Sequence, residues 1–354
     1  MPDKEKNLLI IGTGTIGEPL IGLFSRMKKD LGLDEVIFHK RTPLKHERPK
    51  VNSLIEMGAS LAVDEISMDE FVKLGHKPSY SYDEALDKAS VVIDCTPSGN
   101  INKNIVYKKF KDKLFIAQGS EKGFGMPYAL GINDDKLLSN DSNFLQVVSC
   151  NTHTMARLLK CLSNNAVTSI LQGDFVCIRR ANDLSQDSGF IPSITCGKHG
   201  DDRFGTHHAR DVSDLFDYTF PLPIFSSAIK TNTQYMHTIR FSLALDETLS
   251  SEEITRRIQQ DPYVATTLKK STNSVFSYGR DHGFYGRIYN QAVICTPALS
   301  INHFSDMTKI SGFAFTPQDG NSLLSSVAAS LYGFYGEDYK GFLSPLTEYI
   351  KDEV

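Results

Sequence analysis

The chain has 354 residues, more than the roughly 250 to 300 that one hydrophobic core usually supports, so we expect two domains. Its formal net charge of −4 at pH 7 gives no sign of the basic surface that nucleic acid requires. No apolar run reaches the roughly 18 residues of a membrane span. The 6 cysteines form no CxxC pair and the N-terminus lacks a hydrophobic signal, so a reducing cytoplasm is the expected location, without a nucleic-acid or membrane partner.

The first predicted strand, residues 7–11, leads into a glycine-rich turn and then into helical spacing over residues 18–29. The turn reads Gly12-Thr13-Gly14-Thr15-Ile16-Gly17. In a dinucleotide-binding fold the first glycine permits the tight turn, the second lets a pyrophosphate approach the backbone, and the third lets the helix pack on the strand. The phosphates would rest on the helix N-terminus. This order predicts a dinucleotide site, and the alternative is a glycine turn that binds nothing.

Basic residues follow the second predicted strand, residues 35–38, which continues into His39, Lys40 and Arg41. An NAD-specific site usually has an acidic residue here to bind the ribose 2′-hydroxyl, whereas basic side chains accommodate a 2′-phosphate. The sequence therefore predicts NADP as the preferred cofactor, with NAD as a second one. The alternative is that both cations are solvated surface charges.

A helix at residues 50–57 and a short segment at 60–62 precede two more strands, at 90–95 and 114–117. Their ends are followed by Thr96 and Gly119. In open α/β sheets ligands bind at the carboxyl ends of the strands. We therefore expect Gly12, Thr96, Gly119 and the end of a further strand at Cys150 to line one crevice.

Cys150 is the candidate nucleophile. An apolar run from Leu145 is predicted to be a buried strand that ends at Cys150, and helical spacing follows. A cysteine at a helix start lies beside unpaired backbone N–H groups, whose partial positive charge stabilises a thiolate. The alternative is a cysteine that simply packs in the core.

The pattern changes after Arg157. Helical spacing runs to Leu162, and strand-like segments follow at 166–178, 236–245 and 288–295 before an apolar helix at 321–334. This order indicates an α+β domain with an antiparallel sheet, inserted into the first domain. The last helix needs a sheet face to cover, so we expect it to return to the first domain.

The predicted fold class is therefore α/β, with a Rossmann-type parallel sheet and an inserted α+β catalytic domain. The expected limits are 1–150 plus about 318–354 for the dinucleotide-binding domain and 151–317 for the catalytic domain.

Seven pieces of the sequence together resemble the archaeal-type, class II glyceraldehyde-3-phosphate dehydrogenases. They are GTGTIG, VVIDCTPSGN, QGSEK, VVSCNT, IRRA, THHARDV and the pair Met236-His237, in order within residues 7–245. Beyond residue 245 the resemblance is loose. It implies a phosphorylating aldehyde dehydrogenase that uses NAD or NADP and assembles as a homotetramer. The matching positions are Cys150 as nucleophile, His237 as its base, Thr15, Ile16, Gly119 and Arg180 near the cofactor, and Ser149, Asn151, His207 and His208 near the substrate.

These residues support a coherent chemistry. Oxidising an aldehyde through a thioester needs a thiolate, a base, a hydride acceptor and donors for the oxyanion. His237 would serve as base and donor, and together with the helix N-terminus it would lower the pKa of the Cys150 thiol. The alternative for His237 is a core histidine of an apolar strand.

The remaining candidates also have alternatives. Of Arg179 and Arg180, one should point into the site, suited to bidentate recognition of phosphate or carboxylate, and the other away. The resemblance favours Arg180 beside the cofactor, and Arg179 is a substrate candidate. His207 and His208 could bind a metal, but no cysteine or carboxylate cluster with zinc spacing accompanies them, so we expect no metal site.

Departures from the family affect the substrate more than the reaction. Ile11 and Ser120 replace an asparagine and a glycine, and His153 replaces a small residue, either as a substrate contact or as an exposed helix residue. The loop 183–204 also lacks the family's usual pieces. These changes motivate an alternative, an NADPH-dependent reductase of a short acyl-CoA such as malonyl- or succinyl-CoA, whose carboxylate Lys122 or Lys198 would bind. A non-catalytic nucleotide-binding protein is a lesser alternative, because the set of Cys150, His237 and Arg180 is intact.

Overall fold

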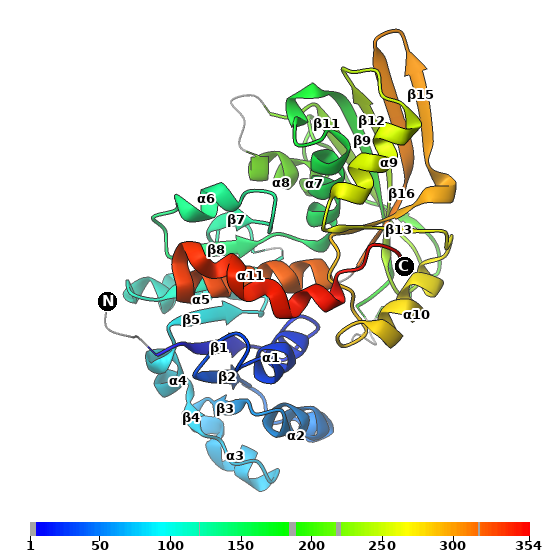
Figure 1. Ribbon diagram of the computed structural model, residues 1–354. Helices are drawn as coiled ribbons and strands as arrows, with labels where there is room; N and C mark the ends of the chain where they lie inside the picture. Colours follow the sequence, from blue (N-terminus) through cyan, green and yellow to red (C-terminus); the bar gives the residue numbers. More distant parts are fainter. Residues whose placement is uncertain (1–4, 120, 184–188, 217–220, 318) are drawn as a thin grey trace. The chain divides into compact units, whose positions relative to one another are not determined.

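The computed structural model describes residues 5–119, 121–183, 189–216, 221–317 and 319–354 (Figure 1). The chain divides into two compact units. Unit 1 comprises Met1–Tyr128, Asp135–Val147 and Leu323–Thr347, and unit 2 comprises Ala129–Asp134, Val148–Ser322 and Glu348–Val354. Within the described residues, no helix is long and apolar enough to cross a membrane.

Unit 1 is built on a parallel sheet of eight strands, in the order β4-β3-β2-β1-β5-β6-β8-β7. The strands are β1 (Asn7–Ile11), β2 (Glu35–His39), β3 (Ser60–Val63), β4 (Tyr80–Ser81), β5 (Val91–Asp94), β6 (Leu114–Gln118), β7 (Met126–Tyr128) and β8 (Phe144–Val147). Every residue of β1 and β5 is buried, as expected for strands covered on both faces. The predicted Rossmann-type α/β fold is confirmed.

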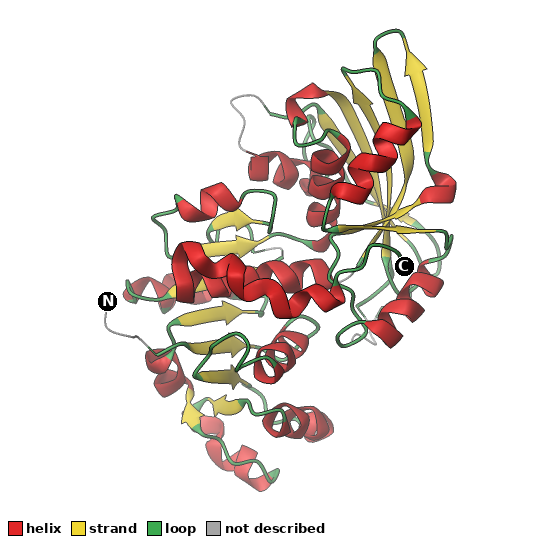
Figure 2. Cartoon of the chain, viewed as in Figure 1, coloured by secondary structure: helices red, strands yellow, loops and turns green. Residues whose placement is uncertain are grey.

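Helices accompany these strands (Figure 2). They are α1 (Gly17–Arg26), α2 (Arg48–Glu56), α3 (Met68–Lys73), α4 (Tyr82–Lys88), α5 (Gly99–Ile105) and α6 (Asp134–Leu138), with short 3-10 turns at η1 (Lys45–Glu47), η2 (Glu65–Ser67) and η3 (Tyr107–Lys109). The last α-helix, α11 (Gly320–Tyr335), packs on the sheet of unit 1 so closely that a Cβ added to Gly333 would lie 2.7 Å from Val91 Cγ2. A terminal 3-10 helix, η6 (Gly336–Tyr349), follows.

Unit 2 contains a mixed sheet in the order β10-β11-β9-β12-β16-β14-β13, with β15 paired to β16. Its strands are β9 (Ile170–Arg179), β10 (Thr195–Cys196), β11 (Ile224–Lys230), β12 (His237–Leu245), β13 (Val264–Thr267), β14 (Ala292–Cys295), β15 (Ser300–Phe304) and β16 (Met307–Thr316). Its helices are α7 (Cys150–Leu162), α8 (His207–Phe216), α9 (Ser251–Gln260) and α10 (Thr272–His282), with 3-10 turns at η4 (Val167–Ser169) and η5 (Thr296–Ala298).

The sheet of unit 2, predicted as antiparallel, is mixed: most of its strand pairs are antiparallel and two are parallel. β9 pairs with β11 and β13 pairs with β14 in parallel, while the other pairs are antiparallel. In both parallel pairs a helix stands between the two strands in the chain, α8 in the first and α10 in the second. Two parallel neighbours need such a crossover, because the chain must return to the same end of the sheet.

The helix α7 carries the candidate nucleophile at its first position and is buried almost throughout. The predicted strand before it ends at Val147, three residues earlier than expected, because Ser149 caps α7. Its side-chain oxygen accepts a hydrogen bond from Thr152 N–H at 3.3 Å, which satisfies one of the first helical N–H groups. Arg157 fixes the middle of α7, since its Nε donates to Gln291 Oε1 at 2.7 Å.

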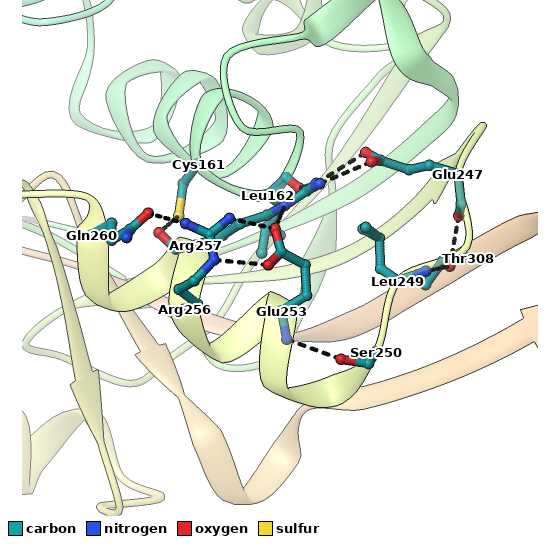
Figure 3. A network of polar contacts seen from close by, with 10 residues as sticks. All are labelled: Cys161, Leu162, Glu247, Leu249, Ser250, Glu253, Arg256, Arg257, Gln260 and Thr308. Atoms are coloured by element: carbon teal, nitrogen blue, oxygen red, sulfur yellow. Dashed lines mark hydrogen bonds and ion pairs between the residues drawn. The ribbon is translucent and has the colours of Figure 1, made fainter.

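The last turn of α7 is held by Arg257 of α9 (Figure 3). Its Nη1 donates to the carbonyl oxygen of Leu162 at 2.7 Å, and its guanidinium binds both carboxylate oxygens of Glu247, at 2.9 and 2.8 Å. Only 6 % of the Arg257 side chain is exposed. A buried fork of this kind satisfies a helix-end carbonyl and fixes α7 against α9.

Replacing Arg257 by methionine should destabilise the protein by about 2 kcal/mol, because Leu162 would lose its donor and Glu247 its partner. A lower denaturation midpoint, measured by urea unfolding, would show this. The control is Arg256→Met, which removes the neighbouring arginine that binds Glu253 from the solvent side and whose side chain is 48 % exposed. Equal midpoints for the two variants would mean that the Arg257 contacts do not stabilise the fold.

Candidate active site

The glycine turn of unit 1 has the geometry that a pyrophosphate needs. Gly12 has φ +93°, a region that favours glycine, and its N–H donates to His39 O at 3.1 Å. A Cβ on Gly17 would lie 2.0 Å from Gly12 O, so α1 packs directly on the turn. A Cβ on Gly14 would meet no atom within 4 Å. The backbone at Gly14 thus faces open space where a ligand can approach, and Thr15 and Ile16 lead from it into α1.

A cavity of about 530 Å³ lies beside this turn and is lined by the ends of β1, β2 and β5, among them Gly12, Arg41 and Thr96. Buried Asp94 positions Thr96, because its Oδ1 accepts hydrogen bonds from Thr96 N at 2.9 Å and Oγ1 at 2.6 Å. The motif VVIDCTPSGN contains this aspartate, although sequence reasoning did not single it out. Gly119 has φ +59° and follows β6, the next strand of the sheet, but it is not among the residues that line the cavity.

The basic residues after β2 differ from each other. Both line the cavity, but Arg41 is exposed, whereas Lys40 is half-buried and forms an ion pair with Glu47. A carboxylate also reaches the cavity, since Asp64, directly after β3, lines it and binds His39 Nε2 at 2.9 Å. Burial lowers the pKa of His39, although Asp64 acts in the opposite direction. Sequence reasoning searched for an acid only after the second strand and therefore missed Asp64.

Cys150 begins α7 in unit 2, where two hydrogen bonds fix its backbone carbonyl group. Asn321 Nδ2 and Thr154 Oγ1 donate to its carbonyl oxygen at 3.0 and 3.2 Å. Burial among protein atoms raises the pKa of the thiol to about 12; the charge of Asp319 adds to this and that of Arg180 opposes it. The sequence-based expectation of a lowered pKa is therefore wrong, because desolvation outweighs the opposing charge of Arg180 and the backbone hydrogen bond at Asn151.

Alkylation of Cys150 should therefore accelerate with pH without reaching a plateau. A thiol reacts as its thiolate, so a raised pKa gives a rate that climbs about tenfold per pH unit between pH 7 and 9.5. Mass spectrometry of the Cys150 peptide after timed iodoacetamide treatment, in a Cys196→Ser background that removes the exposed cysteine, measures this rate. A plateau below pH 8 would show that the thiolate already dominates at neutral pH.

His237 is the first residue of β12 and is joined to Arg180. Its Nδ1 accepts a hydrogen bond from the backbone N–H of Arg180 at 3.0 Å, and burial lowers its pKa to about 3. The ring is therefore neutral at pH 7, and the tautomer that this hydrogen bond requires has its proton on Nε2. The Arg180 side chain is buried, and its Nη1 donates to Tyr235 O at 2.8 Å while its Nη2 binds Asp183 Oδ1 at 2.7 Å.

Arg179 points the other way and lines a second cavity, of about 320 Å³. Lys198, His207, His208 and Arg210 also line it, and among its described lining residues Asp201 is the one carboxylate. The excess of cations suits a phosphate or carboxylate. Sequence reasoning missed Arg210, which stands three residues after His207 on α8 and so shares its face of the helix.

His208 connects this cavity to the start of α7. Its Nε2 lies 3.5 Å from Asn151 Nδ2, and its Nδ1 lies 3.1 Å from Thr206 Oγ1. Asn151 follows Cys150 directly, and its Oδ1 is buried without a hydrogen-bond partner among the described residues. The predicted substrate residues Ser149, Asn151, Arg179, His207 and His208 thus belong to one unit with Cys150 and His237.

His153 is fully buried, so its reading as an exposed helix residue is wrong. Its Nδ1 donates to the carbonyl oxygen of Ser149 at 3.0 Å, one turn earlier in the chain, and burial lowers its pKa to about 4. The imidazole thus packs against the first turn of α7. Lys122 is exposed in unit 1 and does not line the cationic cavity. Ser120 and residues 184–188 of the altered loop lie outside the described residues.

Within the described part of the chain, no group of three or more histidine, cysteine, aspartate or glutamate side chains could hold a metal ion. Arg180, which the family resemblance assigned to the cofactor, lies in unit 2, whereas the glycine turn lies in unit 1. The shared crevice of Gly12, Thr96, Gly119 and Cys150 stays a prediction.

No protein-family model matches the chain. Curated relatives do, and several are named glyceraldehyde-3-phosphate dehydrogenase. The relative from Methanocaldococcus jannaschii is 28 % identical over 312 residues, covering 85 % of this chain and 86 % of its own. The relative from Methanobacterium bryantii is 29 % identical and covers 78 % of this chain and 80 % of its own. The relative from Sulfolobus acidocaldarius is 25 % identical and covers 83 % of each chain. The resemblance predicted from the sequence motifs is therefore confirmed: over most of its length the chain is similar to the archaeal glyceraldehyde-3-phosphate dehydrogenases.

Proposed function

We propose that the protein is an NAD(P)-dependent aldehyde dehydrogenase that works through a thioester on Cys150, with the phosphorylating oxidation of glyceraldehyde 3-phosphate as its reaction. The observation that carries the proposal is the arrangement of unit 2. A cysteine at the start of a buried helix, a neutral buried histidine and a cationic cavity belong to the same compact unit. The curated relatives carry the name of the same reaction.

We assign unit 1 as the dinucleotide-binding domain and unit 2 as the catalytic domain, close to the limits predicted from the sequence. The open backbone at Gly14 and the cavity of about 530 Å³ fit a dinucleotide. When bound, NAD(P) supplies the hydride acceptor. We propose NADP as the preferred cofactor because Arg41 faces the cavity, where it can bind a 2′-phosphate. We also propose that the protein acts in the cytoplasm as a homotetramer.

Cys150 Sγ adds to the aldehyde carbon, so that a C–S bond forms, the thiol proton leaves and the carbonyl oxygen becomes an oxyanion. Loss of hydride from the same carbon restores the C=O bond and gives the thioester. An oxygen of inorganic phosphate then attacks the thioester carbon, the C–S bond breaks, and the acyl phosphate leaves the free cysteine behind. A neutral thiol in the resting protein means that its proton must leave as the substrate binds or reacts.

His237 is suited to the oxyanion. With Nδ1 accepting from Arg180 N–H, the Nε2–H of the neutral ring is a donor that can bind the developing negative charge. To act as the base for the thiol, the role expected from the sequence, the ring must adopt the other tautomer and give up the hydrogen bond to Arg180. His237→Asn separates the role of oxyanion donor from the role of base, since asparagine can donate a hydrogen bond but cannot accept a proton at neutral pH.

The cationic cavity would bind the phosphate of the substrate. Arg179 supplies the planar guanidinium that matches phosphate oxygens, and Lys198 and Arg210 add charge. Asp201 restrains the loop before α8, because its Oδ1 accepts hydrogen bonds from the backbone N–H groups of Arg203 and Phe204 at 2.9 and 3.0 Å.

The acyl-CoA reductase alternative is not favoured, because the curated relatives share the name of the phosphorylating enzyme. An assay at 340 nm decides between them by following NADPH oxidation with 1,3-bisphosphoglycerate and, separately, with malonyl-CoA and succinyl-CoA. We expect turnover with the acyl phosphate. Turnover with a CoA ester and none with the acyl phosphate would overturn the proposed substrate while leaving the thioester chemistry intact.

A further inference from the structure

We propose that Glu47 is a specificity-determining residue, which holds the ammonium group of Lys40 and so limits the preference of the nucleotide site for NADP over NAD. The inference shares one element with the proposed function, the assignment of the cavity beside Gly12 as the dinucleotide site. In dinucleotide-binding folds the tip of the second strand lies at the ribose 2′ position, and Lys40 directly follows β2.

Glu47 binds two lysines at once. One carboxylate oxygen accepts a hydrogen bond from Lys40 Nζ, and the other accepts one from Lys50 Nζ at 3.0 Å. The three side chains are largely buried, with 12 % of Lys40, 19 % of Glu47 and 23 % of Lys50 exposed. Desolvation would raise the pKa of Glu47, but the hydrogen bonds from the two lysines outweigh it and the pKa is lowered. Glu47 is therefore an anion at neutral pH.

The same network reaches the glycine turn. Lys50 Nζ donates to the carbonyl oxygen of Thr13 at 3.3 Å and lies 3.6 Å from Glu18 Oε2, in the first turn of α1. Two lysines therefore face two glutamates, and the charges of this group sum to zero. The charge of Lys40, which the sequence alone assigned to the 2′-phosphate, is compensated before any nucleotide binds.

The charged residues that line the cavity near the 2′ position are Lys40, whose charge Glu47 compensates, one arginine and one acid. Arg41 is exposed and lines the cavity. Asp64 lines it too, and one of its oxygens binds His39. A 2′-phosphate would gain Arg41 but would lie near the anion of Glu47, whereas a 2′-hydroxyl carries no charge and can donate to a carboxylate. Removing the charge of Glu47 should therefore release Lys40 and favour the phosphorylated nucleotide.

The test is a binding experiment without turnover. Isothermal titration with ADP-ribose and with 2′-phospho-ADP-ribose gives the ratio of the two dissociation constants for the wild-type protein and for Glu47→Gln. We expect the variant to bind the 2′-phosphorylated ligand about tenfold more tightly, with less than a twofold change for ADP-ribose. Glu56→Gln is the matched control, since this exposed glutamate, the last residue of the following helix α2, changes the net charge equally without contacting Lys40.

Two further variants, one of Lys40 and one of Arg41, keep the inference testable even if Glu47→Gln folds poorly. Lys40→Met should weaken binding of the 2′-phosphorylated ligand by less than about threefold, because the lysine charge is already compensated, whereas Arg41→Met should weaken it by about tenfold or more. Adding Lys40→Met to Glu47→Gln should abolish the tenfold gain, as expected if Glu47 acts through Lys40.

An unchanged ratio in Glu47→Gln, an equal change in Glu56→Gln, or a tenfold loss in Lys40→Met alone would each overturn the role of Glu47. These outcomes would leave the proposed oxidation of an aldehyde intact. If the wild-type protein binds neither ligand, the nucleotide site is wrong, and the proposed function and this inference fall together.

Discussion

Replacing Cys150 by serine is expected to lower kcat for aldehyde oxidation by roughly ten-thousandfold or more, the loss typical of a removed nucleophile. The serine hydroxyl ionises far less readily than a thiol. Only the backbone N–H groups of the helix start could help it, because no base is hydrogen-bonded to residue 150 among the described interactions. Steady-state rates with glyceraldehyde 3-phosphate, NADP+ and phosphate measure the loss.

The matched control is Cys196→Ser, which replaces an exposed cysteine of an edge strand by the same residue and should keep the wild-type rate. Binding of ADP-ribose to Cys150→Ser should be unchanged, because the glycine turn belongs to the other unit. A Cys150→Ser protein that keeps activity within tenfold of the wild type would contradict covalent catalysis at this position.

Removing two cations of the second cavity is expected to raise KM for glyceraldehyde 3-phosphate by about a hundredfold. Arg179 and Lys198 both line the cavity, and each contact of a charged group with a phosphate is worth about 1.5 to 3 kcal/mol. The variant Arg179→Met/Lys198→Met should therefore bind the phosphorylated aldehyde poorly. Its kcat/KM for unphosphorylated glyceraldehyde, which lacks the group that these cations bind, should change by less than about threefold.

Arg203→Met is the control for this variant. Arg203 is exposed in the same loop region, but it donates to the carbonyl oxygen of Pro221 and does not line the cavity. If the double variant loses activity on both aldehydes equally, the cavity stabilises the fold of unit 2 rather than binding the substrate phosphate.

Those parts of the fold that depend on local pattern could be predicted from the sequence. The order of strand, glycine turn and helix around Gly12 requires only neighbouring residues, and so does the apolar helix α11. The start of a helix at Cys150 was also predictable, although the strand before it ends at Val147. Ser149 caps α7, so the chain passes from strand to helix over Val148 and Ser149 rather than at Cys150.

Features that depend on which side chains the fold brings together in space could not be predicted. Glu47 and Lys40 lie only seven residues apart, yet nothing in the sequence shows that η1 turns the carboxylate back towards β2. Asp64 follows a different strand from the one that the dinucleotide pattern points to. The raised pKa of Cys150 reflects the protein atoms that the folded chain places around the thiol, and the residues beside it in the sequence do not show that environment.

The most direct test of the central claim, a thioester on Cys150, is to trap it. Without inorganic phosphate the acyl group has no acceptor other than water, so the intermediate should accumulate when the protein is mixed with glyceraldehyde 3-phosphate and NADP+ and quenched in acid. We predict that mass spectrometry of the digested protein finds the 3-phosphoglyceroyl group on the peptide containing Cys150. Turnover in the presence of phosphate, with no acyl group on Cys150 or with the acyl group on another residue, would contradict the account.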